Sequence, residues 1–144
     1  MKIFTVVGCR PNFVKIDPEL KQTIIHMGQH YDKNLSQAIF DELKLPIPAH
    51  FLKCKNDLGM MIKKLWKLVE KEKPNLILVF GDTYSSLAGA MAGAYTNTPV
   101  AHVEAGMRSY SKEMPEEKNR VLIDHLSTVL LCANQNARLN LLKE

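Results

Sequence analysis

Acidic side chains follow two apolar runs in the second half of the sequence. Asp82 comes two positions after the run NLILVF, and Glu104 ends the run VAHVE. Glu116 and Glu117 come later, directly behind a proline. Carboxyl groups that converge on one cleft can serve as general acid and general base toward a bound substrate. These four residues are therefore the first candidates for chemistry.

Basic side chains and a histidine occupy similar positions near the N-terminus. Arg10 lies in GCRPNF, directly after the first apolar run, and an arginine at a strand-to-helix turn suits an anionic ligand. This loop carries a single glycine, so it is not the GxGxxG fingerprint of dinucleotide-binding proteins. Lys15 either joins Arg10 at such a site or is simply solvated. His30 lies in GQHYD, after the second apolar run.

Each candidate also has a structural interpretation. Asp82 could cap the helix that follows it, and Glu116 and Glu117 would favour the macrodipole in the first turn of theirs. His102 alternates with valine inside VAHVE, which is more typical of a hydrogen-bonded core histidine than of a catalytic one. Glu104 is harder to explain structurally, because a carboxylate that ends so apolar a run is costly to desolvate.

Short β-rich runs alternate with amphipathic segments along the whole chain. We predict strands at 2–7, 23–26, 75–80, 100–104 and 129–132, and helices at 34–44, 57–73, 83–95, 115–127 and 134–144. This alternation predicts an α/β fold with a doubly wound, Rossmann-like parallel sheet. In such sheets ligands bind outside the carboxyl ends of the strands. The residues expected along that edge are Arg10, His30, Asp82 and Glu104.

The connection between the first two predicted strands is short. Residues 8–22 provide the dozen or so that a parallel crossover needs. A helix limited to 18–22 would be about 7.5 Å long, against a strand of roughly 17–20 Å. We therefore expect part of one sheet face to be poorly covered.

Composition indicates an ordinary globular protein. The chain has 144 residues, of which 46% are hydrophobic and 24% charged, which suits one domain spanning 1–144. No apolar run approaches the roughly 20 residues that span a bilayer, and the first run is too short for a signal peptide, so we expect a cytoplasmic protein without membrane association. Three cysteines without CxxC spacing favour neither disulfides nor a metal site. A net charge of +4 without aromatic interleaving gives little reason to expect nucleic-acid binding.

Five motifs, taken in order, closely resemble those of the non-hydrolysing UDP-N-acetylglucosamine 2-epimerases. They are VVGCRPNFVKI, MGQHYD, VFGDTYSSLAGA, PVAHVEAGMRS and MPEEKNRVLIDHLS. The resemblance runs over essentially the whole chain. It implies the N-terminal half of a glycosyltransferase-B architecture, in which two Rossmann-like domains hold the substrate between them. We expect the family's C-terminal nucleotide-binding domain to be absent from residues 1–144.

The resemblance also implies a reaction. The family interconverts UDP-N-acetylglucosamine and UDP-N-acetylmannosamine for surface polysaccharide precursors, by eliminating UDP to a glycal and adding it back, without a cofactor. The positions that match its acid–base residues are Asp82, Glu104 and Glu116. The positions that match its substrate-binding cations are Arg10 and Lys15, and Arg120 is a further candidate for orienting an acid or a phosphate. Which acid is the base stays open.

Two departures from the family pattern accompany the resemblance. Cys9 stands where threonine is common, and only Gln29 and His30 match the pattern associated with a regulatory second UDP-sugar, so we do not predict that regulation. The expected partners are a UDP-sugar and a separate C-terminal domain polypeptide, with a homodimer as an open alternative to a monomer. Alone, the chain is expected to be inactive. The alternatives are a non-enzymatic remnant of a truncated epimerase gene and half of a glycosyltransferase-B sugar transferase.

Overall fold

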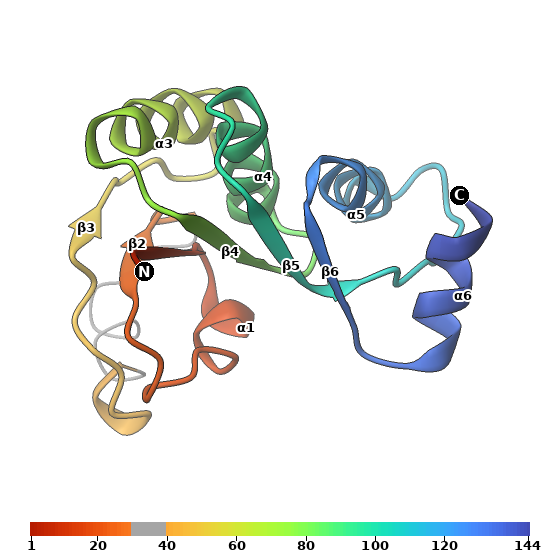
Figure 1. Ribbon diagram of the computed structural model, residues 1–144, viewed down its shortest axis with the longest axis horizontal. Helices are drawn as coiled ribbons and strands as arrows, with labels where there is room; N and C mark the ends of the chain where they lie inside the picture. The colour runs from red at the N-terminus through yellow and green to blue at the C-terminus, as the bar shows by residue number, and fades with distance from the viewer. Residues whose placement is uncertain (30–39) are drawn as a thin grey trace.

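The computed structural model describes residues 1–29 and 40–144, and its centre is a six-stranded parallel sheet (Figure 1). The strands are β1 (Ile3–Val7), β2 (Thr23–His26), β3 (His50–Phe51), β4 (Leu76–Phe80), β5 (Val100–Ala105) and β6 (Val129–Cys132). Their order is β3-β2-β1-β4-β5-β6, with every neighbouring pair parallel. The sheet therefore winds outward in both directions from the boundary between β1 and β4, as predicted for a doubly wound, Rossmann-like fold.

Helices flank this sheet unevenly. They are α1 (Arg10–Phe13), α3 (Leu58–Glu72), α4 (Tyr84–Tyr95), α5 (Pro115–Leu126) and α6 (Gln135–Lys143). Figure 1 shows α3, α4 and α5 along one side of the sheet, α1 on the other side and α6 beyond β6. None of the helices in the described part of the chain is both long enough and apolar enough to cross a membrane.

The predicted elements are largely confirmed. Five strands and four helices form where their patterns placed them, with ends that differ by at most one residue. The predicted helix 34–44 lies partly outside the described residues, and residues 40–42 are helical. The strand β3 was missed, because a two-residue strand has no periodicity and exists only through its pairing with Ile25 and His26 of β2.

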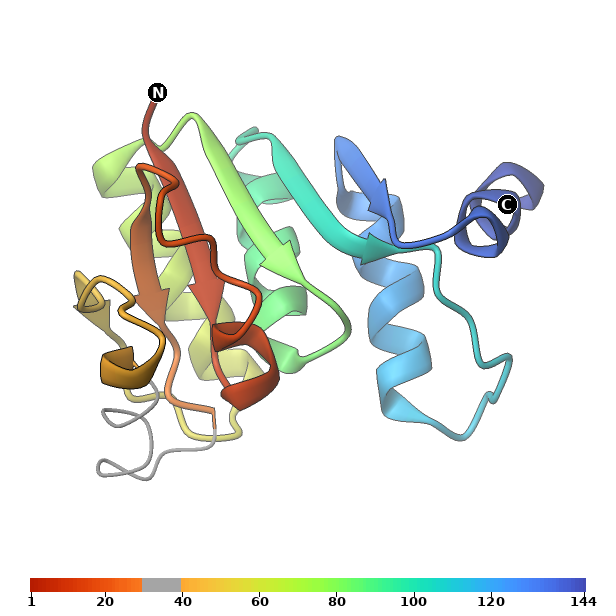
Figure 2. The ribbon, with the colours of Figure 1, turned by 90° about the horizontal axis from the view of Figure 1, so that it is seen from below.

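The helix in the first crossover lies elsewhere than predicted. It is the single turn α1, where Pro11 occupies the first turn and Phe13 is buried, whereas residues 18–22 form no helix. A proline is compatible with the first turn because the missing N–H would have no helical partner there. The expected poor coverage is present, since Leu76 and Leu78 on the α1 side of β4 stay partly exposed. Figure 2 views this thinly covered face.

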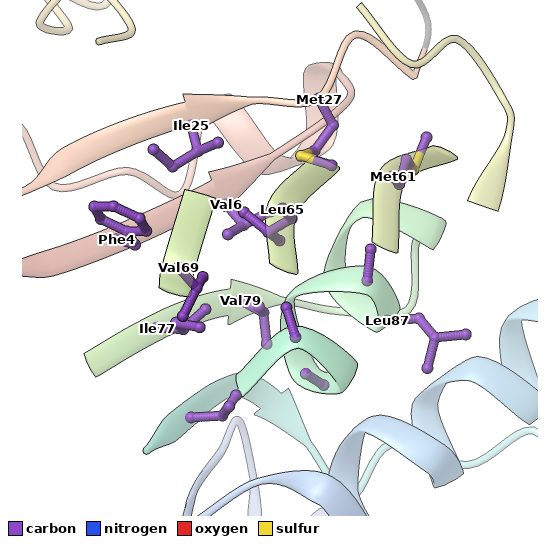
Figure 3. Packing of buried hydrophobic residues seen from close by; sticks show 14 of the residues in the cluster. Phe4, Val6, Ile25, Met27, Met61, Leu65, Val69, Ile77, Val79 and Leu87 are labelled. Atoms are coloured by element: carbon purple, nitrogen blue, oxygen red, sulfur yellow. The ribbon is translucent and has the colours of Figure 1, made fainter. Parts of the chain in front are cut away.

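The main core lies between the sheet and the helices α3 and α4 (Figure 3). On α3, Met61, Leu65 and Val69 recur every four residues, so one face of the helix is buried. The helix begins where the Asp57 carboxylate accepts a hydrogen bond from Met60 N at 2.9 Å. Burial of these side chains fixes α3 on the face of the sheet. The carboxyl edge of the sheet is formed by other residues, among them the predicted site residues.

Candidate active site

Among the described residues, two hollows open at the carboxyl edge of the sheet. The smaller hollow, of about 170 Å³, is lined by Gly81, Asp82, Glu104, Met107, Arg120 and Ala133. The larger hollow, of about 360 Å³, is lined by Cys9, Gln29, Asn56, Asp82, Thr83, Tyr84, Pro115, Glu116 and Asn119. Asp82 belongs to both, so it lies between Glu104 on one side and Glu116 on the other. A third hollow, of about 540 Å³ along α3 beside Trp66, contains none of the predicted site residues.

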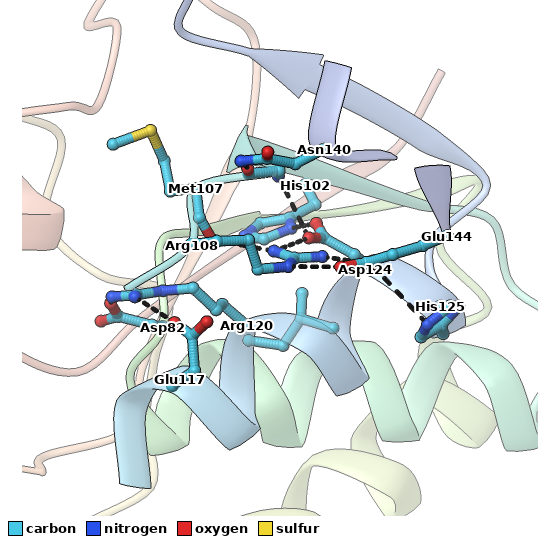
Figure 4. A network of polar contacts seen from close by, with 12 residues as sticks. Asp82, His102, Met107, Arg108, Glu117, Arg120, Asp124, His125, Asn140 and Glu144 are labelled. Carbon is cyan, nitrogen blue, oxygen red and sulfur yellow. Dashed lines mark hydrogen bonds and ion pairs between the residues drawn. The ribbon is translucent and has the colours of Figure 1, made fainter. Parts of the chain in front are cut away.

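Asp82 is held by a cation and not by a helix end. Arg120, one turn into α5, donates to Asp82 Oδ2 and also to Glu117 Oε2 at 2.6 Å (Figure 4). Burial lowers the pKa of Arg120, but the hydrogen bonds to both carboxylates outweigh burial and raise the pKa above its ordinary value. The guanidinium therefore stays charged. The capping role belongs to Thr83, whose hydroxyl accepts from Ser86 N. The interpretation of Asp82 as a helix cap is therefore wrong.

Glu104 has an unusual backbone and a cationic partner. Its φ is +70°, and the pairing of β5 with β6 shifts between Val103 and Ala105. Such an irregularity bends a strand and re-aims its side chains, and a non-glycine residue in this region costs about 1–3 kcal/mol. The Glu104 carboxylate accepts from Lys15 Nζ at 2.6 Å. Lys15 is therefore not an isolated solvated lysine but an ion-pair partner at the smaller hollow.

Glu116 and Glu117 differ sharply although they are neighbours. Glu116 is exposed at the larger hollow, whereas Glu117 is buried. The Glu117 carboxylate accepts from the backbone N–H groups of Ser109 and Tyr110, each at 2.9 Å. Burial raises its pKa, but these hydrogen bonds and Arg120 outweigh burial and lower the pKa to about 2. Glu117 therefore anchors the loop before α5, and Glu116 is free to meet a ligand.

His102 lies in the core with both ring nitrogens partnered. Its Nδ1 is 2.6 Å from Asp124 Oδ1, and its Nε2 is 2.8 Å from the carbonyl oxygen of Gly81. The prediction of a hydrogen-bonded core histidine is confirmed. In the described part of the chain, no three His, Cys, Asp or Glu side chains gather in a way that could hold a metal ion.

A sequence profile of the UDP-N-acetylglucosamine 2-epimerases matches residues 13–144. The chain belongs to this family. It is 46% identical to a UDP-N-acetylglucosamine 2-epimerase homolog of Methanococcus maripaludis, an alignment that covers all of this chain and 44% of that protein. It is 40% identical to the UDP-2,3-diacetamido-2,3-dideoxy-D-glucuronate 2-epimerase of Pseudomonas aeruginosa, over all of this chain and 45% of that protein.

Solved epimerase structures share the fold. The crystal structure of Methanocaldococcus jannaschii UDP-GlcNAc 2-epimerase in complex with UDP-GlcNAc and UDP superimposes with a TM-score of 0.94 at 39% identity, and the match covers 99% of this chain and 43% of that one. The chain thus spans less than half the length of these relatives, consistent with one half of a glycosyltransferase-B architecture.

One predicted residue of this epimerase-family chain lies apart from the hollows. Arg10 is exposed in α1 and lines neither of the hollows that contain Asp82, and His30 lies outside the described residues. Sequence reasoning missed several lining residues, among them Asn119, whose Nδ2 donates to the backbone oxygen of Asp82 at 2.8 Å. Its spacing could have identified it, since Asn119 follows Glu116 by three positions and so shares its helix face.

Proposed function

We propose that this chain supplies the acid–base half of a site that inverts carbon 2 of a UDP-N-acetylhexosamine, with UDP-N-acetylglucosamine and UDP-N-acetylmannosamine as the pair interconverted. One observation carries the proposal. Two carboxylates from neighbouring strands, Asp82 and Glu104, line the same hollow, and each is paired with a cation from a different element, Arg120 and Lys15. Two acids with adjacent cations in one hollow are what an elimination and re-addition of a diphosphate requires.

The proposed chemistry begins at carbon 2 of the sugar. A carboxylate removes the proton from carbon 2, the electron pair of that C–H bond forms the C1–C2 double bond, and the C1–O bond breaks so that UDP leaves with its electrons. UDP then adds back to carbon 1 of the glycal, and an acid protonates carbon 2 from the opposite face. Asp82 and Glu104 are the candidates for base and acid, and Glu116 at the larger hollow is the third.

The cations have a proposed role in binding the diphosphate. Lys15 and Arg120 neutralise the carboxylates that they contact. A diphosphate entering the hollow would compete for these cations, because charge-assisted hydrogen bonds to phosphate are as strong as those to carboxylate. The carboxylates would then be released for proton transfer. Arg10, exposed in α1, is the remaining candidate for a phosphate contact.

The second half of the proposed site comes from the part of the family protein that this chain does not span. Its docking surface is proposed on β6 and α6, where Leu131 is 48% exposed and Leu142 67% exposed. The strand β6 is the last in the sheet order, and an edge strand with exposed apolar side chains favours association. The expected cytoplasmic location and the homodimer alternative stay predictions.

The test is to incubate the chain with UDP-N-acetylglucosamine in deuterated water, alone and with a matching C-terminal epimerase domain. We expect no turnover by the chain alone, and formation of the manno epimer with deuterium at carbon 2 in the mixture. Asp82→Asn should abolish that turnover, whereas Asp57→Asn, which removes a carboxylate at the start of α3 and keeps a capping residue, should not.

Three results would argue against the proposal. They are turnover that survives Asp82→Asn, product that forms without deuterium at carbon 2, and robust exchange by the chain alone. The Pseudomonas relative carries the name of a diacetamido-glucuronate epimerase, so that UDP-sugar is the second substrate to assay.

A further inference from the structure

One buried carboxylate joins the two turns that carry the candidate acids. Asp124 of α5 is 4% exposed and accepts hydrogen bonds from three donors. They are His102 at 2.6 Å, the Gly106 backbone N–H at 3.0 Å and the Arg108 guanidinium at 2.7 Å (Figure 4). Each donor comes from β5 or from the loop directly after it.

His102 extends this contact to the neighbouring strand. Its Nε2 faces the carbonyl oxygen of Gly81, which can only accept, so Nε2 donates. Burial raises the pKa of Asp124, but the hydrogen bonds from His102 and Arg108 outweigh burial and lower it, so Asp124 is an acceptor as well. Both ring nitrogens of His102 therefore face acceptor oxygens, and the ring joins the Asp124 carboxylate to the Gly81 carbonyl.

The two ends of this chain of contacts lie beside the candidate acids. Gly81 directly precedes Asp82, and Gly106 follows Glu104 by two residues. Both glycines have positive φ, +60° and +77°, so each is the turn at which the chain leaves its strand. A contact that fixes these turns also fixes the backbone positions from which the side chains of Asp82 and Glu104 extend.

We propose that His102 and Asp124 are positioning residues that hold Asp82 and Glu104 in register across β4 and β5. The catalytic part of this inference rests on the proposed epimerase function, but the positional part does not. Folding stability alone does not explain why His102 and Asp124 are buried together, because a buried contact of this kind often adds little to the free energy of unfolding compared with apolar side chains. Arg108 also bonds Glu144 of the α6 end at 2.6 Å, so the same network ties α6 to the site.

The positional test uses nuclear magnetic resonance on the chain itself, with ¹⁵N-labelled histidine and ¹³C-labelled carboxyl groups. In the wild-type chain we expect ¹⁵N signals that show His102 hydrogen-bonded to its two partners. In Asp124→Asn and His102→Leu we expect shifted carboxyl signals for both Asp82 and Glu104 and faster hydrogen exchange at Gly106 N–H. His102→Gln keeps an N–H donor toward Gly81, so it should restore the Asp82 signal.

Glu72→Gln is the matched control. Glu72 also joins two partners from different strands, Lys2 and His50, but at the opposite edge of the sheet, so its loss should leave the Asp82 and Glu104 signals in place. The inference is overturned if those signals are unchanged in folded Asp124→Asn. If His102→Leu does not fold, Asp124→Asn and His102→Gln decide the question.

The catalytic test adds the C-terminal epimerase domain. A misplacement of about 1 Å can cost on the order of 100-fold in rate, so we expect Asp124→Asn to lower kcat by about that factor with KM within about twofold. An inactive wild-type mixture would count against the epimerase proposal and leave the magnetic resonance result to decide the positioning. An active mixture in which Asp124→Asn keeps full kcat would overturn the positioning role.

Discussion

Lys15 Nζ lies 2.6 Å from Glu104 Oε2, although 89 positions separate the two residues in the sequence. Lys15 follows α1, and Glu104 belongs to the irregular end of β5. The ion pair bridges the two halves of the sheet across the boundary from which it winds outward. This boundary is where α/β proteins bind ligands, so the ion pair contributes one residue to the candidate site from each half of the sheet.

We expect Lys15→Met to weaken UDP-sugar binding far more than it weakens the fold. The two side chains are 29% and 39% exposed, and ion pairs this accessible contribute about 0–1 kcal/mol to stability. A diphosphate would lose one of its charge-assisted contacts. Denaturant titration and calorimetric titration with UDP-N-acetylglucosamine measure the two effects. Lys67→Met, on the exposed face of α3, is the control, and equal binding by both variants would contradict the assignment.

Glu116→Gln and Glu117→Gln should have opposite consequences. Glu117 is buried with two backbone N–H partners, so its replacement should cost about 1–3 kcal/mol in unfolding free energy. Glu116 is exposed, so its replacement should stay within about 0.5 kcal/mol while lowering turnover in the two-domain mixture. Denaturant midpoints and rates of epimer formation measure the two effects. A stable but inactive Glu117→Gln together with an unstable but active Glu116→Gln would contradict both assignments.

Glu117 should also make stability depend on pH in acid. Its pKa is lowered from 4.5 to about 2 in the folded chain, so the unfolded chain binds the proton first. The stabilisation is complete above pH 4.5 and is lost progressively as the pH falls toward 2. Thermal unfolding at several pH values should show a smaller loss in Glu117→Gln than in the wild-type chain. An identical acid limb in both chains would contradict the assignment.

His26 should make the chain less stable in weak acid. Burial among Phe13, Phe40 and Phe51 lowers its pKa from 6.5 to about 4. Between these values the unfolded chain takes up a proton that the folded chain does not, so stability falls as the pH drops from 6.5 to 4. The loss is on the order of 3 kcal/mol, at 1.36 kcal/mol for each pKa unit.

His26→Phe should remove this dependence. We expect a flatter plot of unfolding free energy against pH between 6.5 and 4.5, whatever the effect on absolute stability from the lost Gly28 N–H contact. His125→Phe makes the same change at an exposed histidine and should keep the wild-type slope. A slope that survives in His26→Phe would assign the acid sensitivity to other groups.

Gly106→Ala should separate β5 from α6. An added Cβ would lie 2.2 Å from the backbone oxygen of Ala137, and the φ of +77° is unfavourable for alanine. We expect a loss of at least about 1–3 kcal/mol in unfolding free energy, measured by denaturant titration. Gly59→Ala meets its nearest neighbour at 3.5 Å within α3 and should be neutral or stabilising. Equal midpoints for Gly106→Ala and the wild-type chain would show that α6 does not pack there in solution.

Much of the fold follows from local pattern. The four-residue recurrence of Met61, Leu65 and Val69 predicts a buried helix face, and the run at 75–80 predicts a buried strand, because burial of apolar side chains must match the backbone period. Asp82 and Glu104 could also be placed from sequence, since the carboxyl ends of parallel strands meet at one edge. The single turn α1 and the strand β3 could not, because so few residues carry no period.

The identity of each partner was decided by the tertiary structure. Glu116 and Glu117 are the same residue type at adjacent positions, and only the rotation of α5 against the loop at Ser109 buries one and exposes the other. His102 was identified from sequence as a core residue, but its link between Asp124 and Gly81 depends on how α5 packs on β5 and how β5 pairs with β4. Sequence thus determined which residues reach the edge of the sheet, because topology alone sets that. Which of them pair was settled by packing, because a hydrogen bond requires distances and directions that no spacing along the chain specifies.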